Sequence, residues 1–415
     1  MSESFPPKPT DTLQQPPGAA SPKRTRVRNR VKLPRPTREQ RRLAETLLPL
    51  LQEAEHALDQ GQPARALTVL QGAAPEPPPY LSPYDQLRWH WLAGAALLAV
   101  HRCAEARDWL MRGMALAGRL RPYVLAKQEQ GFDALTERVR NLLGSYYFQK
   151  GQPGQALLLH RQCLLAINSG RLTDQAVQML IYSSLGNDTL ALSQPQEAIG
   201  FFALARQLAD AAHDDRQHAL DAWGLGRAYA ATQQYARAQA ALQEALHIFE
   251  AQGDQHMSGQ LHAAVGHVLL LLKDYSSAEG HFRQCLEAAE RSGKSVPRAE
   301  ARDALAHWYL ATGEFDKAIS TLQAGLDLLQ ESRDHRAQGQ LTLSLARAYQ
   351  GQYNAPAAEH AFIEALAQIS QSEDSALRLQ AHEAYAAFLS SQGRFQEAFA
   401  EEEAARALQS RSAAE

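Results

Sequence analysis

Polar side chains suited to holding a ligand recur at a regular interval along the sequence. The first set is Ser145, Asn187, Arg227, His267, His307 and Arg347, and from Asn187 onward its members stand 40 residues apart. A second set, one helical turn earlier, contains Asn141, Ser183, Trp223, Asp303, Leu343 and Glu383. Asn amides can bond a peptide backbone and Arg guanidinium groups pair with carboxylates. Trp223 would place an aromatic ring beside the cation of Arg227.

The sequence carries none of the motifs typical of catalysis. It has no Gly-rich phosphate loop, no Gly-x-Ser-x-Gly, no His-Glu-x-x-His and no Cys-x-x-Cys. Cys163 and Cys285 occupy positions that call for small residues and Cys103 lies in a turn, so we expect structural roles. His213-Asp214-Asp215 could touch a metal, but a solvated loop is the simpler interpretation. We therefore expect no enzyme, no catalytic residues, no metal and no cofactor.

The N-terminal segment is strongly basic. Between Lys23 and Arg42 there are ten Lys or Arg residues and one acid, whereas residues 43–415 contain 31 basic and 42 acidic residues. Its flanks are rich in Pro, Ser and Gln, which predicts disorder in isolation. Candidate contacts to a nucleic-acid backbone are Arg24, Arg26, Arg28 and Arg30. A solubilising tail, or one folded back on the acidic body, explains the segment equally well.

Helical hairpins must position these side chains. Leu225-Gly226-x-x-Tyr229 is followed by Ala238, and the same spacing of a small residue and an alanine 12 residues later returns in nine units. The pairs are Ala54 and Ala66, Gly94 and Ala106, Gly144 and Ala156, Gly186 and Ala198, Gly226 and Ala238, Gly266 and Ala278, Ala306 and Ala318, Ala346 and Ala358, and Ala386 and Ala398. Apolar residues at helical spacing flank a polar turn in each unit. Small residues let the two helix axes approach, and a stack of hairpins buries what one cannot.

The pattern resembles the tetratricopeptide repeat (TPR) family over residues 43–410. It keeps a period of 40 residues where about 34 is common, which looks like the longer-helix arrays of kinesin light chains and of some bacterial regulators. The resemblance implies an all-α, right-handed superhelical solenoid of about nine TPR-like hairpins, to which the composition adds a disordered N-terminal arm. It also implies that first helices line a concave groove. The candidate peptide-binding or protein-binding residues are then Asn141, Asn187, Trp223, Arg227, His267, His307 and Arg347.

The predicted organisation follows from breaks in the repeat. We expect the arm at 1–42, a first hairpin at 43–74, a Pro-rich loop at 75–83, the solenoid at 84–410 and a tail at 411–415. Gly94 and Gly144 lie 50 residues apart, so about ten extra residues fall within Arg119–Leu135. Glu402 stands where other units have Phe or Leu, and with Glu401 and Glu403 it predicts a polar outer face for the last helix.

These features favour a non-enzymatic scaffold that binds a protein or peptide in a polar, partly cationic groove. Two alternatives stay open: a regulatory sensor that responds to a ligand or peptide, and a nucleic-acid-associated adaptor acting through residues 23–42. The polar columns could also be merely solvated, since a concave face must be polar somewhere. No apolar run approaches the roughly 18 residues of a membrane helix, and three cysteines without local pairing fit a reducing compartment. We expect a cytoplasmic bacterial protein with no membrane partner.

Overall fold

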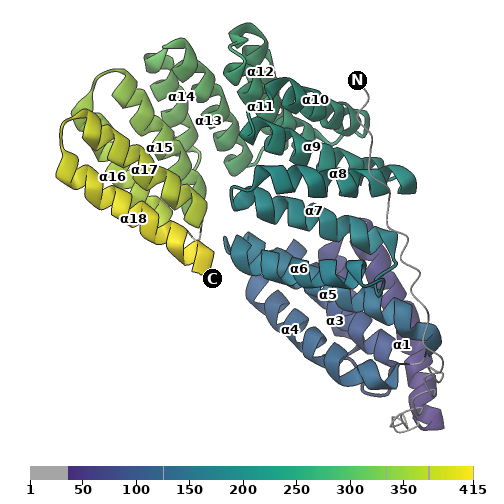
Figure 1. The fold of residues 1–415 in the computed structure, drawn as a ribbon. Helices are drawn as coiled ribbons and strands as arrows, with labels where there is room; N and C mark the ends of the chain where they lie inside the picture. The colour runs from purple at the N-terminus through teal and green to yellow at the C-terminus, as the bar shows by residue number, and fades with distance from the viewer. Residues whose placement is uncertain (1–35, 125, 333, 373, 415) are drawn as a thin grey trace, which may run out of the picture.

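The computed structural model describes residues 36–414 apart from residues 125, 333 and 373, and all regular structure in this part is helical. Eighteen α-helices form nine hairpins, which confirms the expected all-α solenoid (Figure 1). They are α1 (Arg38–Asp59), α2 (Pro63–Ala73), α3 (Pro83–Ala99), α4 (Cys103–Leu120), α5 (Glu129–Gln149), α6 (Pro153–Asn168), α7 (Gln175–Ala191), α8 (Pro195–Ala212), α9 (Asp215–Ala231), α10 (Tyr235–Ala251), α11 (Gln255–Leu271), α12 (Tyr275–Ser292), α13 (Ser295–Thr312), α14 (Phe315–Asp327), α15 (His335–Gly351), α16 (Ala355–Ser370), α17 (Ser375–Ser391) and α18 (Phe395–Ala414).

Residues in the turns determine where the first helix of each hairpin ends and where the second begins. The odd-numbered helices, the first of each hairpin, are followed by a residue with positive φ in all nine hairpins. Four of these residues are glycines, for which this conformation carries no steric cost. The second helices α2, α6 and α8 begin with the prolines expected there, Pro63, Pro153 and Pro195.

An aspartate caps most of the later first helices. Its carboxylate accepts a hydrogen bond from a backbone N–H in the first turn and satisfies a donor that has no partner within the helix. The caps are Asp174, Asp214, Asp254, Asp334 and Asp374, with N–H to oxygen distances of 2.9–3.2 Å. α13 breaks this series, because Lys294 occupies the capping position and makes no side-chain cap. The junction between α12 and α13 therefore differs from its neighbours.

Small residues set the spacing between helices, as the repeat pattern predicts. A Cβ atom on Gly226 would lie 2.5 Å from Cγ of Leu242 on the second helix of the same hairpin. The Phe202 ring of α8 lies between two glycines, because Cβ atoms on Gly186 and Gly224 would lie 2.8 and 2.4 Å from it. Any larger residue would force these helices apart, so the close packing depends on the missing side chains.

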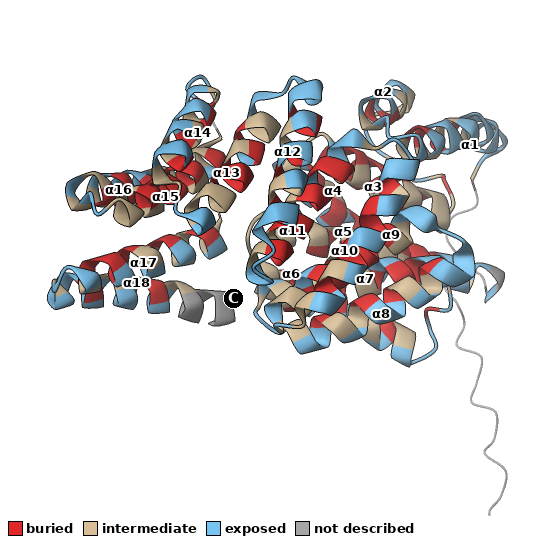
Figure 2. Cartoon of the chain, turned by 90° about the horizontal axis from the view of Figure 1, so that it is seen from above, coloured by how far each residue is buried: buried red, intermediate tan, exposed pale blue. Residues whose placement is uncertain are grey.

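The solenoid curves with its first helices on the inner face. All eight successive pairs of first helices, from α1 and α3 to α15 and α17, pack against each other, whereas the second helices pack mainly against first helices. Elements that contact across repeats lie at the smaller radius, so we call the surface of the odd-numbered helices the inner face. Buried residues concentrate between the two helical layers (Figure 2).

The curve brings the two ends of the array together. Figure 1 shows the end of α18 beside α6, and these two helices contact each other. The Ser375 hydroxyl at the start of α17 donates to the carbonyl of Gly151 in the turn before α6, at 3.1 Å. Residues 224 positions apart therefore meet across one turn of the superhelix.

The ends and the insertion refine the predicted boundaries. α1 begins at Arg38 with a capping box of Thr37 and Gln40, so residues 38–42, which we placed in the arm, are helical. The extra residues between the second and third hairpins form two short 3-10 turns, η1 (Arg121–Tyr123) and η2 (Ala126–Gln128). On α18, Glu402 and Glu403 are exposed as expected, but Phe395 and Phe399 are exposed as well.

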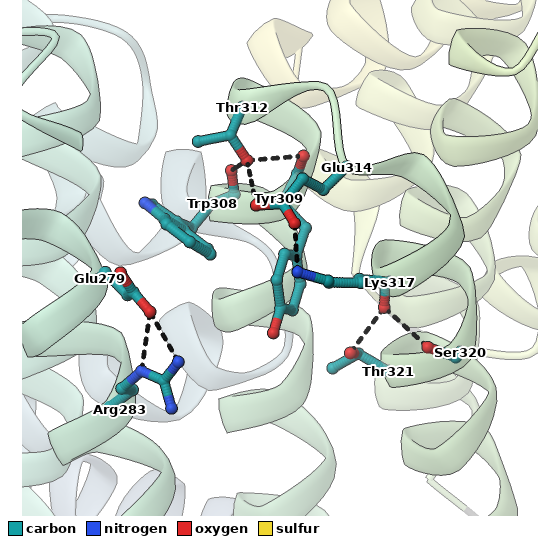
Figure 3. A network of polar contacts seen from close by, with 9 residues as sticks. All are labelled: Glu279, Arg283, Trp308, Tyr309, Thr312, Glu314, Lys317, Ser320 and Thr321. Atoms are coloured by element: carbon teal, nitrogen blue, oxygen red, sulfur yellow. Dashed lines mark hydrogen bonds and ion pairs between the residues drawn. The ribbon is translucent and has the colours of Figure 1, made fainter. Parts of the chain in front are cut away.

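Exposed side chains of the later repeats form pairs within or between neighbouring turns (Figure 3). Arg283 donates two hydrogen bonds of 2.9 and 2.6 Å to one carboxylate oxygen of Glu279, one turn earlier on α12. Lys317 pairs with Glu314 at the start of α14. The Trp308 indole of α13 donates to the Tyr275 carbonyl at the start of α12, at 2.8 Å, and so ties two repeats together. Ion pairs this exposed contribute little to stability.

No described helix combines the length and the apolar character that crossing a bilayer requires.

Candidate functional site

The two asparagines of the candidate site lie at the N-terminal end of the inner face. Asn141 on α5 is buried, and its side-chain oxygen has no hydrogen-bond partner in the described part of the chain. Asn187 on α7 is half-buried and donates from its amide to the Ser183 carbonyl one turn earlier, at 3.0 Å. The Asn187 bond lies within its own helix, which is what a merely structural role would also produce. Asn141 is the better candidate for an unfilled bonding site.

We call the first set of recurring polar residues, from Ser145 to Arg347, the column. Arg227 on α9 is the more exposed of its two arginines. Its side chain is exposed, and it makes no hydrogen bond or ion pair with any described residue. Protein surrounds it closely enough that desolvation lowers the pKa of its guanidinium, although it stays charged at neutral pH. Trp223, one turn earlier, is half-buried. An exposed cation one helical turn from an aromatic residue on a curved inner surface can bind an anionic group.

A polar network around Asp221, which the sequence did not reveal, adjoins Trp223 and Arg227 on α9. Asp221 on α9 is buried, and it accepts from the Ser183 hydroxyl at 2.5 Å and from the Gln217 amide at 3.2 Å. Burial raises the pKa of Asp221 to about 6, against the effect of these two donors. Nothing in the sequence marks Asp221 as part of a site, since it is a single acid next to the apolar Ala222 on a helix.

Two histidines of the column touch each other. The rings of His267 on α11 and His307 on α13 lie 5.2 Å apart, and the ring of His267 meets Phe282 edge-on at 5.1 Å. His307 also contacts the Ser344 hydroxyl of α15 at 3.3 Å. Burial, with His307 as a further cause, lowers the pKa of His267 to about 3. His267 is therefore a neutral imidazole at neutral pH.

Arg347 on α15, from the first set of recurring residues, and Asp303 on α13, from the second, lie at the C-terminal end of the candidate site. Arg347 is half-buried, and burial lowers the pKa of its guanidinium while Asp303 opposes that shift. One oxygen of Asp303 lies 4.0 Å from His307 and has no hydrogen-bond partner among the residues that the structure describes, and the other accepts from Gln340 at 3.5 Å. Arg347 itself makes no hydrogen bond or ion pair with any described residue. A ligand carboxylate could therefore pair with either Arg227 or Arg347 without displacing an existing partner.

The low pKa of His267 predicts a loss of stability in acid. The unfolded chain takes up a proton near pH 6.5, whereas folded His267 resists protonation until about pH 3, so stability falls as the pH drops through this window. His267→Gln should reduce the loss between pH 7 and pH 4.5 by roughly 1–3 kcal/mol. Urea unfolding at a series of pH values measures this slope. His360→Gln, at an exposed site on α16, is the control, and equal slopes in both variants would contradict the assignment.

The structure brings part of the candidate site together. His267 and His307 contact each other, and Asp303 and Ser344 approach His307. Asn141 and Asn187 make no contact with that cluster in the described part of the chain. Arg24, Arg26, Arg28 and Arg30 lie outside the described residues, so the nucleic-acid hypothesis for the arm stays a prediction.

Asp214 and two of the cysteines, which the sequence singled out, have defined surroundings in the described residues. No group of three or more His, Cys, Asp or Glu side chains is arranged to hold a metal ion there. Asp214 is used as the cap of α9. Burial raises the pKa of Cys163, and it raises that of Cys285 to about 11, so neither thiol is a ready nucleophile.

Comparison with known proteins agrees with the fold. Residues 259–331 match the tetratricopeptide repeat family. No curated protein sequence matches the chain. A Rap protein in complex with Competence and Sporulation Factor has a similar structure, with a TM-score of 0.63 and 13% identity over 89% of this chain and 99% of that one.

Two ligand-free structures are similar over comparable lengths. One is the apo quorum sensor NprR from B. thuringiensis, with a TM-score of 0.61 and 15% identity over 88% of this chain and 99% of that one. The other is apo RapI, with a TM-score of 0.60 and 13% identity over 87% and 97%. At this identity the likeness concerns the fold. Residues 259–331 are thus tetratricopeptide repeats, and the described chain folds as a TPR solenoid.

Proposed function

We propose that the chain is a non-enzymatic scaffold that binds an extended protein or peptide segment along its inner face. The observation that carries the proposal is the state of Arg227 and Arg347. Both lie on the inner face three repeats apart, and neither has an acidic partner within ion-pair distance among the described residues. Residues 43–415 contain more acids than bases, and arginines on the outer, second helices such as Arg206 and Arg283 are already paired with acids. Unpaired inner cations therefore suit an acidic ligand.

The remaining inner-face groups suit an extended backbone. The Asn141 and Asp303 side chains each have a buried oxygen without a hydrogen-bond partner among the described residues, and a side-chain rotation that exposes such an oxygen would let it accept from a peptide N–H group. Neutral His267 adds an aromatic surface between the two arginines along the array. One similar structure holds a bound factor, which is compatible with an inner face used for binding.

Charge reversal at the two arginines tests the proposal. A library of short random peptides is screened against the full chain, and enriched peptides should carry Asp, Glu or a free carboxyl terminus. In the Arg227→Glu/Arg347→Glu variant their affinity should fall roughly 10- to 100-fold for each arginine they contact. The matched control is Arg107→Glu/Arg237→Glu, with both charges exposed on second helices. Affinities that survive the inner reversal but not the outer one would overturn the proposal.

A ligand-responsive sensor is the second candidate, and the contact between Ser375 and Gly151 favours it. That contact joins repeats far apart in sequence, so a small change of curvature would make or break it. Small-angle X-ray scattering with and without an enriched peptide tests this. A shift in the radius of gyration would support a sensor, and an unchanged curve would favour a static scaffold.

A further inference from the structure

One junction between repeats lacks the large side chains that fill its neighbours. Between α10 and α11 the core holds Phe249 and Leu261, and between α14 and α15 the residues 80 positions later are Leu329 and Leu341. All four are fully buried. Between α12 and α13 the matching positions are Ala289 and Ala301. At the α12–α13 junction, two methyl groups thus stand where the junctions on either side have two large apolar side chains.

The missing volume remains as a cavity. It measures about 280 Å³ and has a buried floor of Gly259, Cys285, Ala288, Ala289 and Ala301. A Cβ atom on Gly259 would lie 3.1 Å from that of Ala288, so backbone forms part of the wall. An apolar cavity of about 150 Å³ is large enough to bind benzene. This one can hold a larger apolar group.

The mouth of the cavity opens on the inner face. Trp223 of α9 forms one side, and the exposed side chains of Gln255, Gln260 and Glu300 surround it. Glu300 already pairs with Arg336 at 3.4 Å, and desolvation raises the pKa of its carboxyl group. The rim therefore offers amide groups to a ligand backbone, and the floor accepts only apolar surface. Trp223 lies one turn from Arg227, so the cavity adjoins an unpaired cation.

We propose that this cavity is a specificity pocket for one large apolar side chain, aromatic or branched aliphatic, of the segment bound along the inner face. The biological use of the pocket rests on the proposed function, whereas the geometry of the pocket does not depend on it. Because Arg227 lies beside its mouth, the preferred ligand carries an acidic residue close to the apolar one. Buried apolar contact supplies affinity, and the length and shape of the floor select the side chain.

Indole is the probe that tests the pocket by itself. Isothermal titration calorimetry on the full chain should show one site with a dissociation constant of roughly millimolar strength. The Ala289→Phe/Ala301→Leu variant restores the pair found at the neighbouring junction and should weaken indole binding at least tenfold. Ala301→Leu alone serves if the double variant does not fold, as judged by circular dichroism. No binding by the wild-type chain, or equal binding by a folded filled variant, would overturn the proposal.

The same variants separate the pocket from the groove. Arg227→Glu/Arg347→Glu should keep indole binding while it loses acidic peptides, because the cavity walls do not include either arginine. Peptides enriched on the wild-type chain should share a large apolar residue, and the filled variant should bind them at least tenfold more weakly. Peptides that bind the filled and wild-type chains equally would refute the specificity role, even where the charge reversal abolishes binding.

Discussion

Replacing Phe202 with alanine should destabilise the central repeats by about 3–5 kcal/mol. The ring is almost fully buried on α8 between α7 and α9, in a cluster with Leu225 and Ala228. Gly186 and Gly224 touch it from both sides, so no side chain is available to move into the space that the ring leaves. Loss of apolar burial and an open cavity then add together.

The measurement must resolve local unfolding, because repeats in a solenoid contact only their neighbours and can open separately. Amide hydrogen exchange over α7, α8 and α9 should lose protection in Phe202→Ala, with smaller changes in α15–α18. Phe395→Ala is the matched control, since that ring is 70% exposed on α18 and should barely matter. A loss below about 1 kcal/mol at Phe202 would mean that α7 and α9 collapse into the space after all.

The same substitution bears on binding. Asn187 follows Gly186, and Trp223 precedes Gly224, so two candidate contacts are attached to the backbone that the ring separates. A peptide whose affinity falls in Phe202→Ala at temperatures where the chain is still folded would indicate that the inner face needs this spacing. Binding residues on rigid helices depend on the packing behind them.

The hairpins could be predicted from sequence because their determinants are local. A small residue, an alanine 12 positions later and a turn between them lie within one repeat, and the structure places a helix pair at each of the nine. The columns of polar residues follow from the same period. The contact of His267 with His307 fits that reasoning, since 40 residues separate equivalent positions on adjacent first helices.

Features that depend on several repeats at once could not be predicted. The low pKa of His267 requires knowing how much protein surrounds it, and the meeting of Ser375 with Gly151 depends on curvature summed over six repeats. The cavity at Ala289 and Ala301 is marked only by the absence of large residues, which looks like ordinary variation in a list of small packing positions. The basic arm carries a clear charge pattern, but its arginines at positions 24–30 lie outside the described residues.

The second large effect concerns a buried acid. Glu137 on α5 is fully buried and pairs with Arg140 one turn later and with Arg171 at 3.0 Å. Glu137→Ala should cost about 3–5 kcal/mol, because Arg140 stays largely buried and loses its partner. Glu137→Leu/Arg140→Leu should recover most of this loss, since apolar replacement of a buried pair is often close to neutral.

Urea unfolding with hydrogen exchange over α5–α7 measures both variants. Glu279→Ala is the control, because its pair with Arg283 on α12 is exposed and its removal should change little. If Glu137→Ala proved as mild as Glu279→Ala, water would have to replace the carboxylate beside Arg140.

The outcome also bears on the inner face. Glu137 precedes Asn141 by one turn, and the carbonyl of Asn141 contacts buried His160 at 3.0 Å. A destabilised α5 should therefore weaken peptide contacts at Asn141 before those at Arg347, which lies five repeats further along the array on α15.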